Sequence, residues 1–300
     1  MIKTLFGFNF QSNLQVLVAF DTMKCTTLYY HKEQGWIPLT KFRMDPAVTL
    51  PMVGLSAVVA MGGLYLVGGD MFAAATRKCL FRYNATSNGW TQLANMKAVH
   101  NCFSATVHHR DHIYVIGGGL PERYNLNTDQ WETLPRPPKY CRTSSAVVYN
   151  DRILVLGRND HDNQTHLMLF HPETKQWDLL LSEDTPSRMV MIVLVVHEQH
   201  CYCVSTKNGI LSTQLIRMTT NNGVTEATLE PKKTADGCSI FCIDDSKYVR
   251  LHDYYVFKVK TEYTDPNTGD VFADLKCPIN KNAVSHACFL EMPLDVYKLT

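Results

Sequence analysis

Apolar and polar residues alternate in short runs through the middle of the chain, and turn-forming residues separate one run from the next. Alternation with a period of two indicates a strand with one buried face. Clusters of Gly, Asn and Asp between such runs indicate turns. In one segment the expected strands are Cys102–His109, His112–Gly118, Arg123–Leu126 and Gln130–Leu134. This segment is therefore predicted to form four short antiparallel strands.

The same arrangement recurs elsewhere in the chain. Each copy places an aromatic residue seven positions before a tryptophan, and the copies use all 4 tryptophans: Tyr29–Trp36, Tyr83–Trp90, Tyr124–Trp131 and Phe170–Trp177. Four-stranded units repeated every 40–50 residues or so are typical of propeller blades. The further strands expected in the two neighbouring units are Leu55–Met61, Leu64–Gly69, Leu80–Tyr83, Trp90–Leu93, Ser144–Asn150, Arg152–Gly157, His166–Phe170 and Gln176–Leu181.

The two ends of the chain are expected to complete one blade together. The N-terminal region supplies three strands, and Asn282–Met292, which resembles Lys97–Val107, supplies the missing first strand. Pairing both termini in one blade removes exposed sheet edges. The prediction is an all-β, six-bladed propeller at 14–300 after a lead-in at 1–13, with a ring of seven unusually small blades as the rival. The expected blades are 14–40 plus 282–300, 53–94, 100–135, 142–182, 189–230 and 238–277, of which the fifth contains the hairpin Met191–Ser205 and the sixth contains Ser239–Asp245 and Tyr254–Leu275.

With the pairs Gly68-Gly69 and Gly117-Gly118 and the aromatic–tryptophan spacing, residues 14–300 resemble the kelch-repeat family. The resemblance is strongest in units two to four. Unit four carries Gly157-Arg158 in place of the pair, and units one, five and six lack it. Glycine at the end of the second strand permits positive φ where blades crowd together. The tryptophans are interpreted as packing residues between blades.

The resemblance extends to the propeller of BTB–kelch proteins, in which a BTB–BACK module engages a cullin-3 ubiquitin ligase and the propeller captures the substrate. The sequence contains no BTB-like segment, so it resembles an excised substrate-receptor domain or a stand-alone kelch protein. The leading functional hypothesis is the substrate-recognition propeller of a cullin-3 adaptor. The alternative is a cytoskeletal or scaffolding kelch protein that binds partners without ubiquitin transfer.

The composition argues against some classes of binding partner and indicates a cellular compartment. A formal net charge of +1 argues against a dedicated nucleic-acid binder, and no apolar run reaches the roughly 20 residues that span a bilayer. The 10 cysteines form no CxxC pair, which favours a reducing compartment, cytoplasmic with the nucleus also open. Cys201 and Cys203 are interpreted as small apolar packing residues.

The best metal candidate is HHRDH, with His108, His109 and His112 around a hairpin turn. Adjacent strand residues point to opposite faces, so a solvated turn is the better interpretation. Kelch propellers include copper oxidases and sialic-acid mutarotases, but no counterpart of the oxidase ligands is recognisable here. No phosphate loop or nucleophile elbow is present either. We expect no enzyme, no cofactor and no metal site.

Basic residues exceed acidic residues in the loops expected on one face of the propeller, and the reverse holds on the opposite face. This difference in charge between the two faces has two interpretations. The loop charges could serve only solubility, or the basic face could be a receptor for a protein segment that carries carboxylates. Tyr140 and Phe72 are candidate aromatic anchors, although either could instead pack beneath its loop. The candidate partner-binding residues are Phe72, Arg77, Arg123, Tyr140, Arg142, Arg158 and Arg188.

Overall fold

The computed structural model describes the chain as strands joined by short turns, with no α-helix in the part that it describes. The described residues are 13–21, 26–31, 35–38, 56–68, 78–84, 87, 89–100, 104–141, 143–159, 164–184, 189–197, 200–207, 210–221, 224–232, 240–243, 246–251, 255–260 and 284–293.

These strands form antiparallel sheets, which we call blades and number in chain order. Blade one has the strand order β23-β1-β2-β3, blades two to five each contain four consecutive strands, and three strands of blade six are described. The first three blades comprise β1 (Asn13–Asp21), β2 (Thr26–His31), β3 (Gly35–Pro38), β23 (Val284–Pro293), β4 (Ser56–Ala60), β5 (Gly63–Val67), β6 (Leu80–Asn84), β7 (Gly89–Gln92), β8 (Ala105–His109), β9 (His112–Ile116), β10 (Glu122–Asn125) and β11 (Gln130–Thr133). The remainder comprise β12 (Thr143–Tyr149), β13 (Arg152–Asn159), β14 (Gln164–His171), β15 (Gln176–Asp184), β16 (Met189–His197), β17 (His200–Lys207), β18 (Ile210–Asn221), β19 (Val224–Lys232), β20 (Ile240–Ile243), β21 (Ser246–Leu251) and β22 (Tyr255–Lys260).

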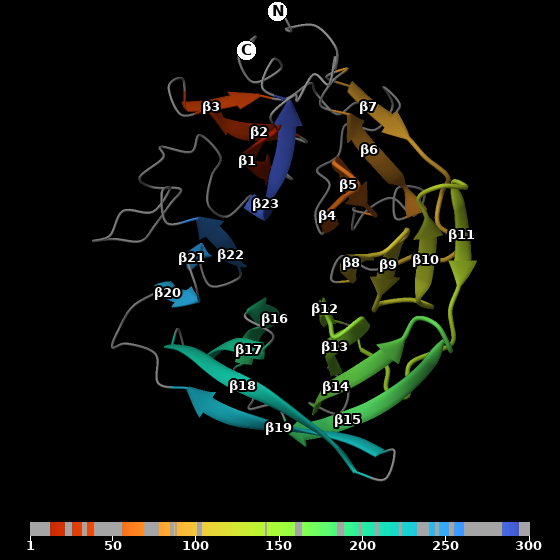
Figure 1. Ribbon diagram of the computed structural model, residues 1–300, viewed down its shortest axis with the longest axis vertical. Helices are drawn as coiled ribbons and strands as arrows, with labels where there is room; N and C mark the ends of the chain where they lie inside the picture. The colour runs from red at the N-terminus through yellow and green to blue at the C-terminus, as the bar shows by residue number, and fades with distance from the viewer. Residues whose placement is uncertain are drawn as a thin grey trace, which may run out of the picture.

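The blades follow one another around the centre of the view (Figure 1). Strands β4, β8, β12, β16 and β23 lie nearest the centre, and β7, β11, β15 and β19 lie at the periphery. Neighbouring inner strands touch, since β4 contacts β8 and β23, and β12 contacts β8 and β16. The first and last described strands also pair, with Val16 opposite Leu290 and Val18 opposite Cys288.

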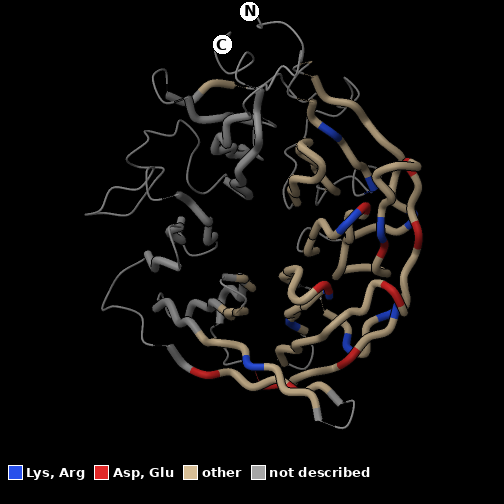
Figure 2. Tube along the Cα trace, in the orientation of Figure 1, with Lys and Arg blue, Asp and Glu red and all other residues tan. Residues whose placement is uncertain are grey.

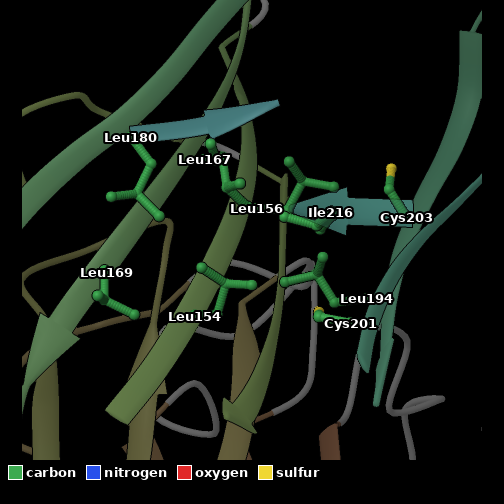
Figure 3. Close-up of a cluster of buried hydrophobic side chains, with 10 residues drawn as sticks. Leu154, Leu156, Leu167, Leu169, Leu180, Leu194, Cys201, Cys203 and Ile216 are labelled. Atoms are coloured by element: carbon green, nitrogen blue, oxygen red, sulfur yellow. The ribbon is translucent and has the colours of Figure 1, made fainter. Parts of the chain in front are cut away.

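The hydrophobic core lies between blades, and the period of two explains how each strand serves two interfaces. In β9, Ile113 and Val115 pack toward blade two, whereas Tyr114 and Ile116 pack toward blade four. Because successive side chains point to opposite faces, a strand buried on both faces is apolar throughout. The interface between blades four and five repeats this design (Figure 3). Its buried side chains are Leu154, Leu156, Leu167, Leu169, Leu180, Leu194, Cys201, Cys203, Ile216 and Ala227.

Gly68 and the pair Gly117-Gly118 lie where the sequence predicted, at the end of the second strand, and Gly69 lies outside the described residues. Gly68, Gly117 and Gly118 have φ values of 66°, 103° and 68°, a region in which a side chain is strained. In blade four the equivalent residues Gly157 and Arg158 remain inside β13, so this strand is longer than predicted.

Other strands differ from the prediction in detail. Trp36 pairs with Tyr30 and not with Tyr29, because the turn between β2 and β3 is one residue shorter than in the other copies. In blade five, β18 and β19 were not predicted, and in blade six the pattern did not indicate β21. These strands lack the glycine pair and the tryptophan that mark units two to four.

Candidate partner-binding surface

The repeated aromatic and tryptophan residues form ring pairs in the outer half of blades two, three and four. Tyr124 and Trp131 lie opposite each other on β10 and β11, with ring centroids 5.2 Å apart. The equivalent distances are 5.1 Å for Tyr83–Trp90 and 4.7 Å for Phe170–Trp177. Such tilted pairs at 4.5–7 Å are favourable beyond their buried area.

The tryptophans also hold the segments that connect one blade to the next, which we call linkers. Trp131 donates its indole N–H to the carbonyl oxygen of Ala94, 2.7 Å away in the linker between blades two and three. Trp177 donates in the same way to Pro135, 2.9 Å away in the next linker. Asp129 adds a further restraint, since its carboxylate accepts the backbone N–H of Ala94 and the hydroxyl of Tyr124, each at 2.9 Å.

Glu122 anchors the other end of the linker between blades two and three. Its carboxylate is fully buried and accepts the backbone N–H groups of Lys97 and Ala98, each at 3.0 Å. The buried ring of His100 lies beside it, with 3.7 Å between Nε2 and the nearer carboxylate oxygen, and its Nδ1 lies 3.1 Å from the carbonyl oxygen of Gly117. The carboxylate of Glu122 and the carbonyl oxygen of Gly117, both in blade three, therefore hold the backbone and the His100 ring of this linker in place.

The loop after β9, Gly117–Leu120, lies between two linkers. Gly118 donates its N–H to the carbonyl of Cys141 at 3.1 Å, which joins the loop to the linker between blades three and four. On the other side, a Cβ atom at Gly119 would lie 2.5 Å from the carbonyl oxygen of Val99. Only glycine fits this close approach without displacing the backbone, which explains the third glycine of the GGG run.

These contacts bring Lys97–His100, Gly117–Leu120 and Arg136–Tyr140 together as one surface, which we call the blade-three loop surface. Val99 and Tyr140 are its exposed apolar side chains, with 38% and 52% of their surface accessible. Lys97 and Arg136 are exposed, and Lys139 is half-buried. The three segments contain no Asp or Glu. Rigid backbone, two apolar side chains and three cations suit recognition of a protein segment.

The residues predicted from the sequence to bind a partner fall into three groups. Tyr140 lies on the blade-three loop surface. Arg123 lies in β10, where it was expected at the junction of a loop and a strand, and Arg158 lies in β13, where it was expected in the loop just after the strand. Phe72, Arg77, Arg142 and Arg188 lie outside the described residues.

Arg123 is engaged inside blade three. Its side chain is 17% exposed and donates Nε–H to Glu132 at 2.8 Å. Glu132 also pairs with Lys175 of blade four. The hydrogen bond from Lys175 lowers the pKa of the Glu132 carboxyl; burial opposes this and Arg123 reinforces it. Basic and acidic positions of this kind recur along the periphery of the described blades (Figure 2). Arg123 therefore serves blade packing in this structure.

The HHRDH hairpin lies on the opposite face, and its histidines have separate surroundings. His109 is buried, with Nε2 3.3 Å from a carboxylate oxygen of Asp151. His108 Nε2 lies 2.6 Å from the carbonyl oxygen of Arg110. His112 Nε2 lies 3.3 Å from the side-chain nitrogen of Asn125. The predicted turn is present, but it is only partly solvated because His109 packs inside.

The same hairpin connects blades three and four. Arg110 has a φ of 52° and pairs with both Asp151 and Glu173 of blade four. Within the residues that the structure describes, no group of three or more His, Cys, Asp or Glu side chains is placed to hold a metal ion.

Cys201 and Cys203 point into the core between blades four and five, as predicted. Both thiols are free and buried, and burial raises the pKa of each to about 12. At neutral pH they remain protonated and therefore poor nucleophiles. Over the described part of the chain, no helix is long and apolar enough to cross a membrane.

Glu122, Val99 and Gly119 were not among the residues that the sequence singled out. Glu122 lies in a loop-like stretch where a charged residue is ordinarily solvated, so its burial carries no signal in the pattern. The run GGG was the available signal for Gly119, since a third glycine beyond the repeated pair indicates a close approach.

Comparison with known proteins finds kelch-repeat proteins. The chain is 28% identical to Kelch-like protein 41a of Danio rerio over 189 residues, which cover 57% of this chain and 30% of the relative. It is 25% identical to Kelch repeat and BTB domain-containing protein 2 of Homo sapiens over 153 residues, covering 50% of this chain and 23% of the relative. An F-box/kelch-repeat protein of Arabidopsis thaliana is 30% identical over 107 residues, covering 32% of this chain and 22% of the relative.

The matched region thus spans less than a third of the length of these relatives. No family model matches the chain. The matches agree with the glycine pairs of units two and three and with the aromatic–tryptophan pairs of blades two to four. Together, the repeated blade and these relatives support a kelch-like domain in this chain.

Proposed function

We propose that this chain is a non-enzymatic, protein-binding kelch propeller that captures its partner on the linker face. The observation that carries the proposal is the blade-three loop surface, where Val99 and Tyr140 are exposed. Glu122 and Trp131 fix the linker of Val99, and Trp177 and Gly118 bind the linker of Tyr140. Tyrosine is among the residue types enriched at interface hot spots.

The propeller in this proposal has six blades and is closed within blade one. The support is the pairing of β1 with β23 and the contacts of β23 with β4 and β22. A closed ring gives every blade a neighbour on both faces, so no apolar blade face is left exposed.

In the complete protein, the propeller is proposed to be the substrate receptor of a cullin-3 ubiquitin ligase, acting from the cytoplasm or nucleus. The names of two relatives support this role in part, since one is a kelch repeat and BTB domain-containing protein and another is a kelch-like protein. In the family that the sequence resembles, a BTB–BACK module contacts cullin-3. A cytoskeletal or scaffolding kelch protein remains the alternative function.

The test is affinity purification of the complete gene product from its native cells, followed by mass spectrometry. The adaptor role predicts cullin-3 together with a protein whose abundance rises when the gene is deleted. Recovery of cytoskeletal proteins without cullin-3 supports the scaffolding alternative and contradicts the adaptor role.

Two arginines predicted from the sequence to begin successive blades, Arg142 and Arg188, enter the proposal as the residues of this receptor face that lie nearest the central axis. Arg142 follows Cys141 in the chain, and the carbonyl oxygen of Cys141 accepts the backbone N–H of Gly118. A pull-down of the recovered partner compares wild type with the variant Arg142→Ala plus Arg188→Ala. The matched control changes Arg110 and Arg152 on the opposite face. Loss of the partner only in the control would show that the face has been assigned wrongly.

A further inference from the structure

A buried imidazole and a buried carboxylate face each other beneath the linker between blades two and three. The accessible fractions of the His100 and Glu122 side chains are 1% and 0%, and 3.7 Å separates Nε2 of His100 from the nearer oxygen of Glu122. Nε2 is enclosed and makes no hydrogen bond within the part of the chain that the structure describes. Whether this atom carries a hydrogen therefore decides whether the pair attracts or repels.

The hydrogen bonds of Glu122 match a negative charge. Its two carboxylate oxygens accept backbone N–H groups, one from Lys97 and the other from Ala98, each at 3.0 Å. An ionised carboxylate suits two such donors, because its oxygens only accept. A fully buried negative charge is costly unless a cation compensates it.

The surroundings of the His100 ring call for a hydrogen on both nitrogens. Nδ1 lies 3.1 Å from the carbonyl oxygen of Gly117, which can only accept, so Nδ1 carries a hydrogen. In a neutral ring Nε2 would then present a lone pair toward the carboxylate of Glu122. A hydrogen on Nε2 replaces this repulsion with attraction between opposite charges.

The other charged groups around this pair are engaged elsewhere or exposed. Lys97, on the same linker, is exposed, and its carbonyl oxygen accepts the ammonium group of Lys78 at 2.7 Å. From β10, the guanidinium of Arg123 donates to Glu132. The glycine loop that packs against the ring contributes no ionisable side chain. Among the described residues, His100 is thus the group placed to compensate the buried carboxylate.

We propose that His100 and Glu122 form a proton-dependent lock on this linker, with His100 as an imidazolium ion at neutral pH. When the proton passes to solvent, a bare Nε2 and an uncompensated carboxylate share one buried space, and the linker is released. Because Val99 lies between Ala98 and His100, the proton controls the order of the blade-three loop surface. The inference goes beyond the proposed function, and no partner enters its test.

The pH dependence of the lock has a definite sign. In the unfolded chain a histidine is largely neutral above about pH 6.5. The folded chain therefore binds one proton more than the unfolded chain in this range, and the stabilisation from the pair is lost as the pH rises.

The direct test is nitrogen NMR of the chain labelled with isotope-enriched histidine, because the shifts of the two ring nitrogens distinguish an imidazolium ion from either neutral tautomer. His100 is assigned from the signal lost in His100→Gln or, if that variant does not fold, from cross-relaxation with the protons of Gly117. At neutral pH both nitrogens are expected to carry hydrogen, and at alkaline pH Nε2 is expected to lose it. A neutral His100 ring at neutral pH overturns the inference.

Hydrogen exchange then measures release of the linker. As His100 loses its proton, exchange at the amides of Lys97 and Ala98 is expected to rise about tenfold or more relative to Ala94, after correction for base catalysis. Ala94 is the matched control in the same linker, because its N–H is accepted by Asp129 and not by Glu122. Exchange that rises equally at all three amides overturns the lock, whereas the proposed function is tested separately by the proteins recovered with the complete gene product.

Discussion

At the scale of single residues, the tryptophans of the repeat act through their indole N–H as well as through their rings. Trp131 is 6% exposed and donates to Ala94, while Trp177 is half-buried and donates to Pro135. The ring accounts for packing between strands, and the hydrogen bond fixes the linker that precedes the blade. This second role explains why an indole, and not only a large apolar side chain, occupies the position.

Trp131→Phe is expected to lower the free energy of unfolding by about 1–2 kcal/mol, through loss of the hydrogen bond and of buried volume. Trp177→Phe is expected to cost less, because its site is more exposed. Urea denaturation followed by circular dichroism measures both. Equal stability of wild type and Trp131→Phe would show that the indole N–H contributes nothing to holding the linker.

Glu122 provides a second test at this scale. Glu122→Gln keeps the shape but replaces one acceptor oxygen with a donor, so one linker N–H loses its partner. We expect a loss of about 1–3 kcal/mol and faster hydrogen exchange at Lys97 and Ala98. The exposed Glu226→Gln, as the matched control, is expected to change stability by less than about 0.5 kcal/mol. Unchanged exchange at both amides in Glu122→Gln contradicts the anchoring role.

Some of these residues could be selected from the sequence, and others could not. Tyr140 could be selected from its type and its place in a linker. Arg123 was predicted to begin a strand at the edge of a loop, and in the structure it is the second residue of β10 and pairs with Glu132. The strand boundary was wrong by one residue, and the sequence did not indicate the acidic partner opposite Arg123 on β11. Burial of Glu122 could not be read from the sequence, because it depends on contacts with a linker about 25 residues away.

At the scale of elements, the β8–β9 hairpin contains a titratable group that links stability to pH. Burial lowers the pKa of His109 below its ordinary 6.5; Asp151 opposes this shift and Arg110 adds to it. Burial lowers the pKa of His112 as well, and Arg123 adds to that shift. The unfolded chain therefore binds more protons than the folded chain just below pH 6.5.

Stability is consequently expected to fall as the pH drops through 6.5, and this contribution levels off below the folded pKa values. His109→Gln is expected to reduce that fall. The measurement is the urea midpoint at neutral pH and again about one unit below pH 6.5, for wild type and variant, with the exposed His200→Gln as control. A fall in midpoint that is as large in His109→Gln as in wild type contradicts the assignment.

Strands marked by several local signals at once were predicted, and strands marked by one were missed. In blades two to four, two-residue turns and the aromatic–tryptophan spacing act together, with a glycine pair in blades two and three, so local pattern and fold agree. Strands β18 and β19 lack the glycine pair and the tryptophan, but Asn222-Gly223 stands between them in the sequence and was the available hairpin signal. The missing repeat marks, and not a missing turn signal, explain why these strands were not predicted.

At the scale of the whole molecule, the cores lie between blades, so each blade depends on its neighbours for burial. Ile113 and Tyr114 are adjacent in β9 yet belong to different interfaces. Stability of such arrays is close to a sum over neighbouring units. In the proposed closed ring, the first and last blades would each gain a neighbour in the same way.

In the proposed closed ring, the N-terminal strand β1 and the C-terminal strand β23 pair in one blade. A native cysteine in β23 permits a direct test of this pairing. Val18 of β1 lies opposite Cys288 of β23, at a separation that a disulfide can bridge between antiparallel partners. Val18→Cys, oxidised mildly and digested without reduction, is expected to yield a peptide that joins the introduced thiol to Cys288. Leu17→Cys lies opposite Phe289 and serves as the control. Absence of the joined peptide from folded, oxidised Val18→Cys, or its equal yield from Leu17→Cys, would contradict closure in this register.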